Sequence, residues 1–219
     1  MRADEYDAWY ESARGRWIGE TEFRLLRRLL ALRPGQSLLD VGCGTGWFTR
    51  RFASILGLKV VGLDCNAQWL EYAREHDCRS QYLLGDSCCL PFANASFDCV
   101  VSIAALCFID DWPRALREIV RVARGRIVVG TLNRASLLWR SKGQEGGSGA
   151  YRGARWHTRA QLRFALAALP VRNLEFHSAI FVPTASRMAR AAEAVLPTRL
   201  PWGGLLVAAG DRLSPWDGK

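Results

Sequence analysis

Apolar residues along the chain recur at two spacings, and stretches of the two kinds alternate. Helical spacing covers residues 3–14 and 18–32, and Pro34-Gly35 ends the second stretch. Short apolar runs typical of buried strands then alternate with further helical stretches. The predicted strands are 37–41, 59–63, 81–84, 97–103 and 126–131, and the predicted helices are 47–56, 67–76 and 112–123. This β-α alternation predicts a mostly parallel sheet with helices on both faces.

The last third of the chain departs from this rhythm. Thr158 and Gln161 form a capping box for a helix over 159–168, which Pro170 ends. A strand over 174–182, a helix over 185–195 and a strand over 205–209 follow. Two closing strands without full crossovers indicate an antiparallel edge strand, so we expect a Rossmann-like, seven-stranded α/β fold. The glycine-rich residues 141–153 are expected to form a mobile loop within it.

The chain length suits one domain. With 219 residues, of which 49% are hydrophobic, there is enough chain for one substantial core. We expect a single domain over 1–219, with a helical cap at 1–35, a ligand-binding core at 36–131 and closing elements at 132–219. The longest apolar runs fall far short of the roughly 20 residues that span a bilayer, and the N-terminus does not resemble a secretion signal. We therefore expect a cytoplasmic protein.

Cysteine and arginine are both abundant. The seven cysteines have no C-x-x-C pair, which favours buried free thiols in a reducing compartment over a disulfide framework or a metal site, so we expect no metal. The net charge of +9 comes almost wholly from arginine. Arginines scattered over solvated helix faces explain this charge, and the alternative is an anionic substrate or nucleic acid. We favour the first interpretation.

The segment 38–46 is the most informative one. It reads Leu-Leu-Asp-Val-Gly-Cys-Gly-Thr-Gly, an apolar run that ends at Asp40 and opens into Gly42, Gly44 and Gly46. Glycines at such a strand-to-helix turn let the backbone lie against a ligand that a Cβ would push away. The free N–H groups of the following helix face the same ligand. The segment therefore predicts an adenosine-containing cofactor at the carboxyl end of the first strand.

The surrounding residues narrow the choice of cofactor. No G-K-[ST] follows the loop, which argues against a nucleoside triphosphate, and Trp47 stands where a dinucleotide site wants its third glycine. Asp64 lies about eighteen residues after Gly46, where a carboxylate can accept hydrogen bonds from ribose hydroxyls. Asp40 would repel phosphate but can hold an ammonium group, directly or through water. S-adenosylmethionine, an adenosine with a cationic tail, fits this description.

These residues resemble the class I S-adenosylmethionine-dependent methyltransferases, in the small-molecule branch that includes the quinone-biosynthesis C-methyltransferases. The resemblance covers 38–131 and rests on four motifs in family order. They are residues 38–46, Val61-Gly62-Leu63-Asp64, Gly85-Asp86-Ser87 with Leu90-Pro91-Phe92, and Ser96-Phe97-Asp98-Cys99-Val100-Val101-Ser102. A bridge over 115–122 also resembles the family, although the turn after it is shorter than usual.

The resemblance implies a role for each matching residue. The backbone of the first motif, including Gly42, Cys43, Gly44 and Gly46, would contact the methionine moiety, and Asp64 would bind the ribose. The other implied cofactor contacts are Cys65 beside the adenine, Asp86 and Ser87 at the adenine amino group, and Ala104 and Ala105 at the sulfonium end.

Candidate residues of the N-terminal arm lie outside these motifs. We expect Tyr6 and Arg14 to cap the cofactor, and Trp9, Tyr10 and Trp17 to form an aromatic wall for the acceptor. The alternative is an amphipathic helix that packs its aromatic side chains into the core. In proteins of the resembling family this arm often covers the active site, which favours the first interpretation.

Further candidates follow the fifth strand. His157 is the candidate general base, with packing beside the helix cap as the alternative. Asn133 and Tyr151 are expected to shape the acceptor pocket, unless they belong to a solvated loop. Methyl transfer from a sulfonium is an in-line displacement, and a base helps only when the acceptor must lose a proton.

We therefore expect an S-adenosylmethionine-dependent methyltransferase that acts on a small-molecule acceptor. A nucleic-acid methyltransferase is one alternative, disfavoured because no Asn-Pro-Pro-aromatic stretch follows the fourth strand. A non-catalytic protein that only binds the cofactor is another, since no residue is chemically indispensable to the transfer. The oligomeric state is not indicated by the sequence.

Overall fold

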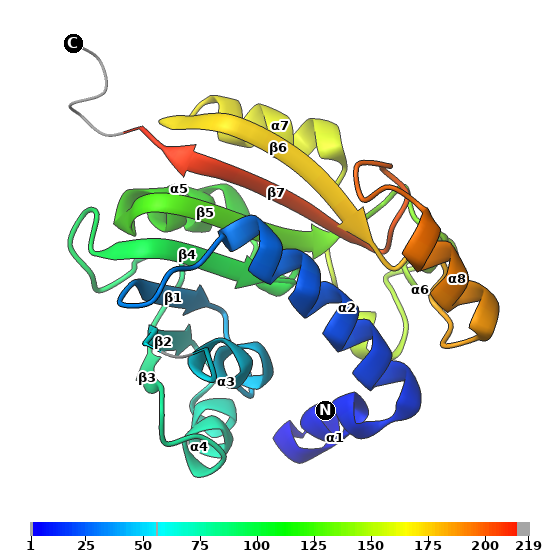
Figure 1. Ribbon diagram of the computed structural model, residues 1–219, viewed down its shortest axis with the longest axis horizontal. Helices are drawn as coiled ribbons and strands as arrows, with labels where there is room; N and C mark the ends of the chain where they lie inside the picture. The colour runs from blue at the N-terminus through cyan, green and yellow to red at the C-terminus, as the bar shows by residue number, and fades with distance from the viewer. Residues whose placement is uncertain (1, 56, 214–219) are drawn as a thin grey trace.

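A seven-stranded sheet runs through the middle of the protein, in a computed structural model that describes residues 2–55 and 57–213 (Figure 1). The strand order is β3-β2-β1-β4-β5-β7-β6. The strands are β1 (Ser37–Val41), β2 (Lys59–Asp64), β3 (Gln81–Leu84), β4 (Phe97–Ile103), β5 (Ala123–Leu132), β6 (Val171–Ala179) and β7 (Leu205–Arg212). The first five strands are parallel, and β7 pairs antiparallel with both β5 and β6. The predicted fold class is confirmed, with β7 inside the sheet and β6 at its edge.

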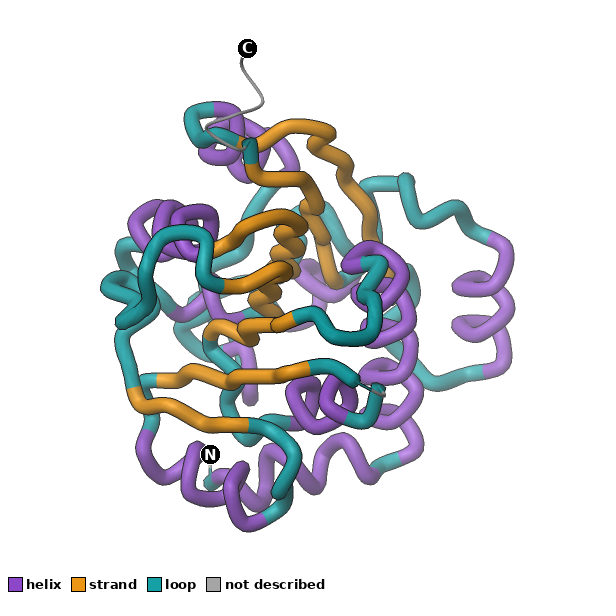
Figure 2. The backbone as a smooth tube through the Cα atoms, turned by 60° about the vertical axis from the view of Figure 1, so that its left-hand side comes forward, coloured by secondary structure: helices purple, strands orange, loops and turns teal. Residues whose placement is uncertain are grey.

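Helices cover both faces of this sheet (Figure 2). They are α1 (Ala3–Glu11), α2 (Ala13–Leu30), α3 (Trp47–Ala53), α4 (Ala67–Glu75), α5 (Trp112–Val122), α6 (Leu137–Lys142), α7 (Arg159–Ala167) and α8 (Arg187–Val195), with short 3-10 turns η1 (Ala105–Phe108) and η2 (Gly149–Tyr151). Because side chains alternate along a strand, Leu38 packs under α2 and α3 whereas Leu39 packs under α5. Both faces are therefore buried, as a parallel sheet requires.

The two N-terminal helices agree with the predicted stretches 3–14 and 18–32, but the break between them lies at Ser12 rather than over residues 15–17. Ser12 adopts an extended conformation (φ −65°, ψ 152°), and its Oγ accepts a hydrogen bond from the N–H of Gly15 at 3.0 Å. Ser12 thus acts as the N-cap of α2 and breaks the chain between the helices. The predicted position of the break is therefore wrong, although the prediction of two helices is confirmed.

Other boundaries differ in the second half of the chain. The edge strand runs over Val171–Ala179 rather than 174–182, because Ile180 takes a left-handed φ of 65° that ends the strand. The short α6 was not predicted, and its last two residues are the first two of the glycine-rich segment 141–153. The predicted helix 47–56 ends at Ala53, and its last residue lies outside the described residues.

The cysteines carry no disulfide, yet most are not buried. Cys99 and Cys107 are buried, whereas Cys65, Cys78 and Cys89 are exposed, so the expectation of buried thiols is wrong for these three. No helix within residues 2–55 and 57–213 combines the length and apolar character needed to cross a bilayer.

Candidate cofactor and acceptor site

The loop between β1 and α3 has the backbone that its glycines predict. Gly42, Gly44 and Gly46 have φ values of 76°, 57° and 78°, in the left-handed region that favours glycine. A Cβ on Gly42 would stand 2.2 Å from the Cβ of Ala105, and one on Gly46 would stand 2.7 Å from the hydroxyl of Tyr82. The loop is therefore closed tightly over η1 on one side and β3 on the other, and the predicted contact residue Ala105 lies directly beside it.

Two acidic residues follow the neighbouring strands at the same edge of the sheet. Asp64 ends β2, and its carboxylate accepts hydrogen bonds from the N–H groups of Gly44 at 2.8 Å and Asn66 at 2.9 Å. Asp86 follows β3, and its Oδ1 accepts from the N–H of Cys88 at 2.8 Å. The N–H of Gly85 donates to the carbonyl of Asp64, which joins the two segments. Since each carboxylate oxygen has two lone pairs, both side chains keep capacity for a ligand.

The predicted neighbours of these acids lie in the same loops. Cys65 and Asp86 are exposed, and Ser87 is half-buried. The Sγ of Cys43 stands 2.9 Å from the place that a Cβ on Gly62 would occupy, so Cys43 packs against β2. Ala104 adopts φ 57°, and its N–H donates to the carbonyl of Gly130 at 2.8 Å. The structure therefore brings together the cofactor-side residues predicted from the four motifs.

Asp40 stands apart from this group. It is 2% exposed, and its Oδ2 accepts a hydrogen bond from the hydroxyl of Thr49 at 2.7 Å. Burial raises the pKa of this carboxyl to about 7, although the Thr49 hydrogen bond lowers it. Because Asp40 is buried, a direct contact with an ammonium group does not fit the structure. A contact through water fits it better, as does a role in holding the start of α3.

Helix α1 is anchored on the glycine loop by Asp7, which the sequence prediction did not include. Its carboxylate accepts from the hydroxyl of Thr45 at 2.9 Å and pairs with the guanidinium of Arg50 at 2.8 Å. Arg50 also donates to the carbonyl of Thr45 at 2.6 Å. Asp7 lies three residues before Tyr10 and thus on the buried face of α1, which is a signal that helical spacing provides.

The aromatic residues of the arm divide between site and core. Tyr6 stacks on Trp69 with ring centroids 5.0 Å apart, and a Cβ on Gly44 would touch the same indole at 3.2 Å, so Tyr6 reaches the edge of the glycine loop. Tyr10 stacks on Trp47 at 4.2 Å and is buried. Trp9 and Trp17 pack with the core under α2. The core interpretation thus holds for Trp17, whereas Tyr6 has the position expected of a cap.

Several polar side chains lie near these tyrosines. Burial raises the pKa of Tyr151 to about 12, the charge of Glu22 raises it further, and the positive charge of Arg14 lowers it. Burial raises the pKa of both Tyr6 and Tyr10, and the charge of Glu22 is a smaller cause in the same direction. The predicted residues Tyr6, Tyr10, Arg14 and Tyr151 therefore lie within electrostatic range of one another or of the same carboxyl, although two distant parts of the chain, the N-terminal arm and η2, supply them.

Glu22 is the second residue that the sequence prediction missed. Burial raises the pKa of its carboxyl to about 8, with the charge of Glu193 as a smaller cause in the same direction. Glu22 lies four residues after Ile18 and four before Leu26, both buried, so helical spacing alone places it on the inward face of α2. A carboxyl whose pKa is raised to about 8 and whose charge acts on three tyrosines of the candidate site is a candidate acid or base.

The other two predicted residues lie in packed surroundings. His157 is 1% exposed, its Nδ1 is 4.0 Å from the Sγ of Cys107, and its ring meets Trp112 edge-on at 4.8 Å. Burial lowers its pKa to about 4, with the charge of Arg155 as a second cause. This favours the packing interpretation over the base. Asn133 is 1% exposed, and its amide donates to the carbonyls of Pro201 and Gly203, so it holds two loops together.

Comparison with known proteins agrees with this geometry. Residues 39–128 match a protein family described as a methyltransferase domain. The chain is 44% identical over 115 residues to a malonyl-[acyl-carrier protein] O-methyltransferase of Erwinia pyrifoliae, across 51% of this chain and 44% of that protein. It is 36% identical over 173 residues to an uncharacterized protein of Mycobacterium tuberculosis, across 75% and 56%. The chain thus spans about half the length of the curated relatives it matches.

Solved structures show the same fold. A SAM-dependent methyltransferase from Thermotoga maritima has a TM-score of 0.75 at 24% identity, over 96% of each chain. The geranyl diphosphate C-methyltransferase of Streptomyces coelicolor, solved with S-adenosyl-L-homocysteine, has a TM-score of 0.67 at 18% identity, over 90% of this chain and 82% of that one. None of these proteins is named as a quinone C-methyltransferase, so that branch stays a prediction. The solved structures thus show the predicted methyltransferase fold, and residues 39–128 match the family described as a methyltransferase domain.

Proposed function

We propose that this protein transfers the methyl group of S-adenosylmethionine to a small-molecule acceptor. The observation that carries the proposal is the glycine loop, whose three left-handed glycines lie between η1 and β3 while Asp64 accepts the N–H of Gly44. This arrangement offers close backbone approach, a ribose-binding carboxylate and no lysine for phosphate.

The residues that would hold the cofactor follow from the loop. Asp64 would accept hydrogen bonds from the ribose, the loop from Gly42 to Gly46 would carry the methionine end, and Asp86 would meet the adenine. When bound, the cofactor supplies an electrophilic methyl group. The protein then has to orient the acceptor behind that methyl and exclude water, for which the packed tyrosines of α1 are suited.

Calorimetry with S-adenosylmethionine and S-adenosylhomocysteine tests the cofactor assignment. Asp64→Ala is expected to weaken binding by about 1–3 kcal/mol through loss of charge-assisted hydrogen bonds. Asp98→Ala is the matched control, because the Asp98 carboxylate also accepts a backbone N–H, that of Ser37 at 2.8 Å, but at the start of β1 and β4. Unchanged affinity in Asp64→Ala, or binding of NAD or ATP in place of S-adenosylmethionine, would contradict the proposal.

A carboxylate-bearing acyl acceptor is the second candidate. The Nε of Arg14 is buried without a hydrogen-bond partner among the described residues, and its charge acts on Tyr151. A guanidinium so placed can pair with a carboxylate, which suits the malonyl-[acyl-carrier protein] named for the Erwinia relative. Arg14→Gln should then raise the KM for acyl acceptors that bear a free carboxylate and leave that for uncharged acceptors unchanged.

Other possibilities lead to different outcomes of the same assays. Cofactor binding without turnover over a broad acceptor panel would favour the non-catalytic alternative. Methylation of RNA, together with tight and salt-sensitive RNA binding, would favour a nucleic-acid methyltransferase. We also propose a cytoplasmic location, since all seven cysteines are free and three are exposed.

A further inference from the structure

Helix α8 presents an apolar stripe to solvent. Met188 is 82% exposed and Val195 is 80% exposed, and Ala191 between them is exposed as well. These residues are spaced i, i+3 and i+7, so they share one face of the helix. The opposite face holds the helix to the body through Ala189, which is fully buried, and through Glu193.

The attachment of α8 explains why its outer face is free. The carboxylate of Glu193 accepts hydrogen bonds from the N–H groups of Ile180 and Phe181, both at 3.0 Å. These N–H groups follow the end of β6, so the inward side of α8 is attached just beyond the carboxyl end of the edge strand. Figure 1 shows α8 on the outside of the molecule, beyond the ends of β6 and β7. Its stripe is not needed for that attachment.

The segment after α8 joins this surface to α2. Trp202 is 57% exposed in that segment. The guanidinium of Arg28, on α2, donates to the hydroxyl of Thr198 at 2.9 Å. From α8, the guanidinium of Arg190 lies 6.0 Å from the ring centroid of Trp17, also on α2. Helix α8 and the segment after it therefore contact α2, and we call the outer surface of α2, α8 and this segment the α2–α8 face.

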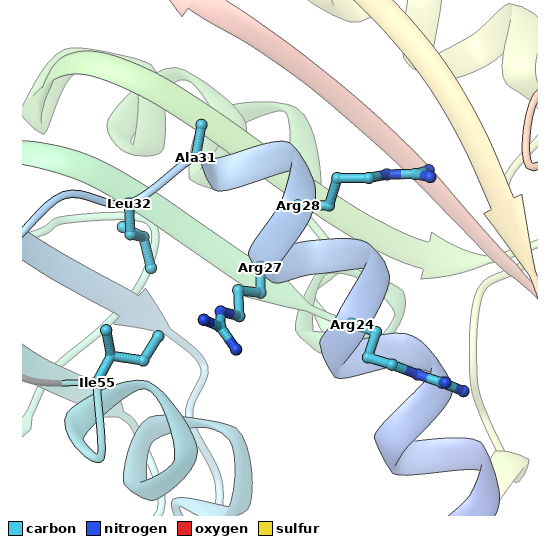
Figure 3. A pocket seen from close by; sticks show the side chains of 6 residues that line it. All are labelled: Arg24, Arg27, Arg28, Ala31, Leu32 and Ile55. Atoms are coloured by element: carbon cyan, nitrogen blue, oxygen red, sulfur yellow. The ribbon is translucent and has the colours of Figure 1, made fainter.

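Uncompensated positive charge accompanies the apolar side chains. Arg24, Arg27 and Arg28 line a groove on α2 whose floor includes Leu32 and Ile55, and Figure 3 shows Arg27 extended toward α3 while Arg24 and Arg28 point to the other side. Around α8, Arg187 and Arg199 are exposed as well, whereas Arg190 turns toward Trp17. Arg24, Arg28, Arg187 and Arg199 are therefore the arginines that can face a common partner, and Arg27 is not one of them. Within residues 2–55 and 57–213, none of these six arginines forms an ion pair with a carboxylate.

The nearby carboxylates do not neutralise this charge. Glu20 is paired with Arg51 at 2.7 Å, and Glu193 is used by the backbone after β6. Exposed apolar side chains flanked by arginine are typical of surfaces that insert shallowly at the headgroup boundary of anionic membranes. Nucleic acid would use the arginines but would leave the stripe of α8 in water, at a cost that a bilayer avoids.

We propose that the α2–α8 face binds peripherally to the surface of an anionic lipid bilayer. The stripe of α8 and Trp202 would enter the headgroup region, and the arginines would lie over the lipid phosphates. The carboxyl ends of β6 and β1 lie at the same edge of the sheet. Binding would therefore bring the edge that carries the glycine loop toward the membrane.

Vesicle co-sedimentation of the full chain tests this inference. Vesicles of phosphatidylcholine alone are compared with vesicles that contain about one third phosphatidylglycerol, at low and high salt. We expect the wild-type protein to pellet only with the anionic vesicles and to be released by salt. Met188→Ser/Val195→Ser and Arg187→Gln/Arg199→Gln should each reduce the bound fraction at least fivefold.

The matched control is Phe164→Ser on α7. Phe164 is 83% exposed and has Arg163 beside it, but it lies on a helix that packs on the other face of the sheet. We expect this variant to bind vesicles like the wild type, and thermal unfolding checks that every variant is folded. Failure of the wild type to pellet with anionic vesicles overturns the proposal. Equal loss of binding in Phe164→Ser, or unaltered binding in both double variants, overturns it as well.

Retention on heparin distinguishes a general polyanion site. If heparin holds the wild-type protein but anionic vesicles do not, the arginines recognise a soluble polyanion and the membrane proposal is wrong. If the Met188→Ser/Val195→Ser variant loses vesicle binding while it keeps its affinity for heparin, the apolar stripe contributes as proposed.

Discussion

The proposed cofactor side and the proposed acceptor side of the candidate site are built in different ways. On the cofactor side, carboxylates bind backbone N–H groups of the loops. Asp64 accepts from the N–H groups of Asn66 and Gly44, and Asp86 accepts from the N–H of Cys88 in its own turn. On the acceptor side, side chains far apart in the sequence bind one another, as with Asp7 and Arg50. The first kind of contact is encoded by glycine and aspartate at fixed spacing, whereas the second depends on the completed fold.

The largest expected effect comes from adding a methyl group on the cofactor side. Gly42→Ala combines a left-handed φ with a contact of 2.2 Å to Ala105, and should cost about 3 kcal/mol of stability and most of the cofactor affinity. Gly146→Ala is the control, because Gly146 has a similar φ of 83° but no atom within 4 Å of the added Cβ. It should cost about 1 kcal/mol in urea unfolding. Equal costs would show that the loop is not sterically closed.

On the acceptor side, removal of the anchor of α1 should have the next largest effect. Asp7→Ala leaves Arg50 and Thr45 without their carboxylate, and should cost about 2 kcal/mol because the pair is mostly buried. Cofactor affinity should fall with it. Glu11→Ala removes a pair with Arg16 whose side chains are 70% and 62% exposed, and should change stability little. Similar unfolding midpoints for the two variants would contradict the anchoring role.

The raised pKa of Glu22 predicts a pH dependence that belongs to the acceptor side. The folded protein keeps this proton up to a pKa of about 8, whereas the unfolded chain loses it near 4.5, so stability falls as the pH rises through that window. Glu22→Gln should remove this loss. Relative to the wild type, it should gain about 1–2 kcal/mol between pH 5 and pH 9, allowing for partial solvent exposure.

Urea unfolding at pH 5, 7 and 9 checks this prediction. Asp40, whose pKa is raised to about 7, contributes a loss of the same sign in both proteins and cancels in the difference. A difference between wild type and Glu22→Gln that does not change with pH would show that Glu22 is ionised in the folded state at neutral pH.

The smallest expected effect lies at a local contact. In α7 the Thr158 hydroxyl accepts the N–H of Gln161 at 3.2 Å, in the capping box that the sequence predicts. Thr158→Ala should cost about 1 kcal/mol. Thr158→Ser should restore most of it, and a loss as large as that of Asp7→Ala would mean that the cap supports more than its own helix.

The sequence predicts the cofactor side well because its signals are local. Strands 37–41, 81–84 and 97–103 have the predicted bounds, since each is an apolar run ended by a turn or an acid. The break between the first two helices was predicted a few residues too late, because the helical pattern continues across Ser12. The start of β6 was missed because Arg172 and Asn173 are polar, which an edge strand with a bulge tolerates.

The acceptor side was predicted as a set of residues but not as an arrangement. Tyr10 and Tyr151 were predicted at the acceptor, and Tyr6 and Arg14 as a cap on the cofactor. The structure gathers all four through the folding of α1, α2 and η2. Glu22 was missed although helical spacing marks it as inward. His157 was chosen for its chemistry, and its burial beside Cys107 and Trp112 is a tertiary contact that no local pattern reports.

The antiparallel placement of β7 has a consequence for how this protein can diversify. Since β7 returns between β5 and β6, the whole connection over residues 180–204 emerges at the edge of the sheet where the glycine loop lies. Insertions or exchanges in that connection would leave every parallel strand pair untouched. Sequence changes in this connection can therefore alter the surface beside the glycine loop while the loop itself stays the same.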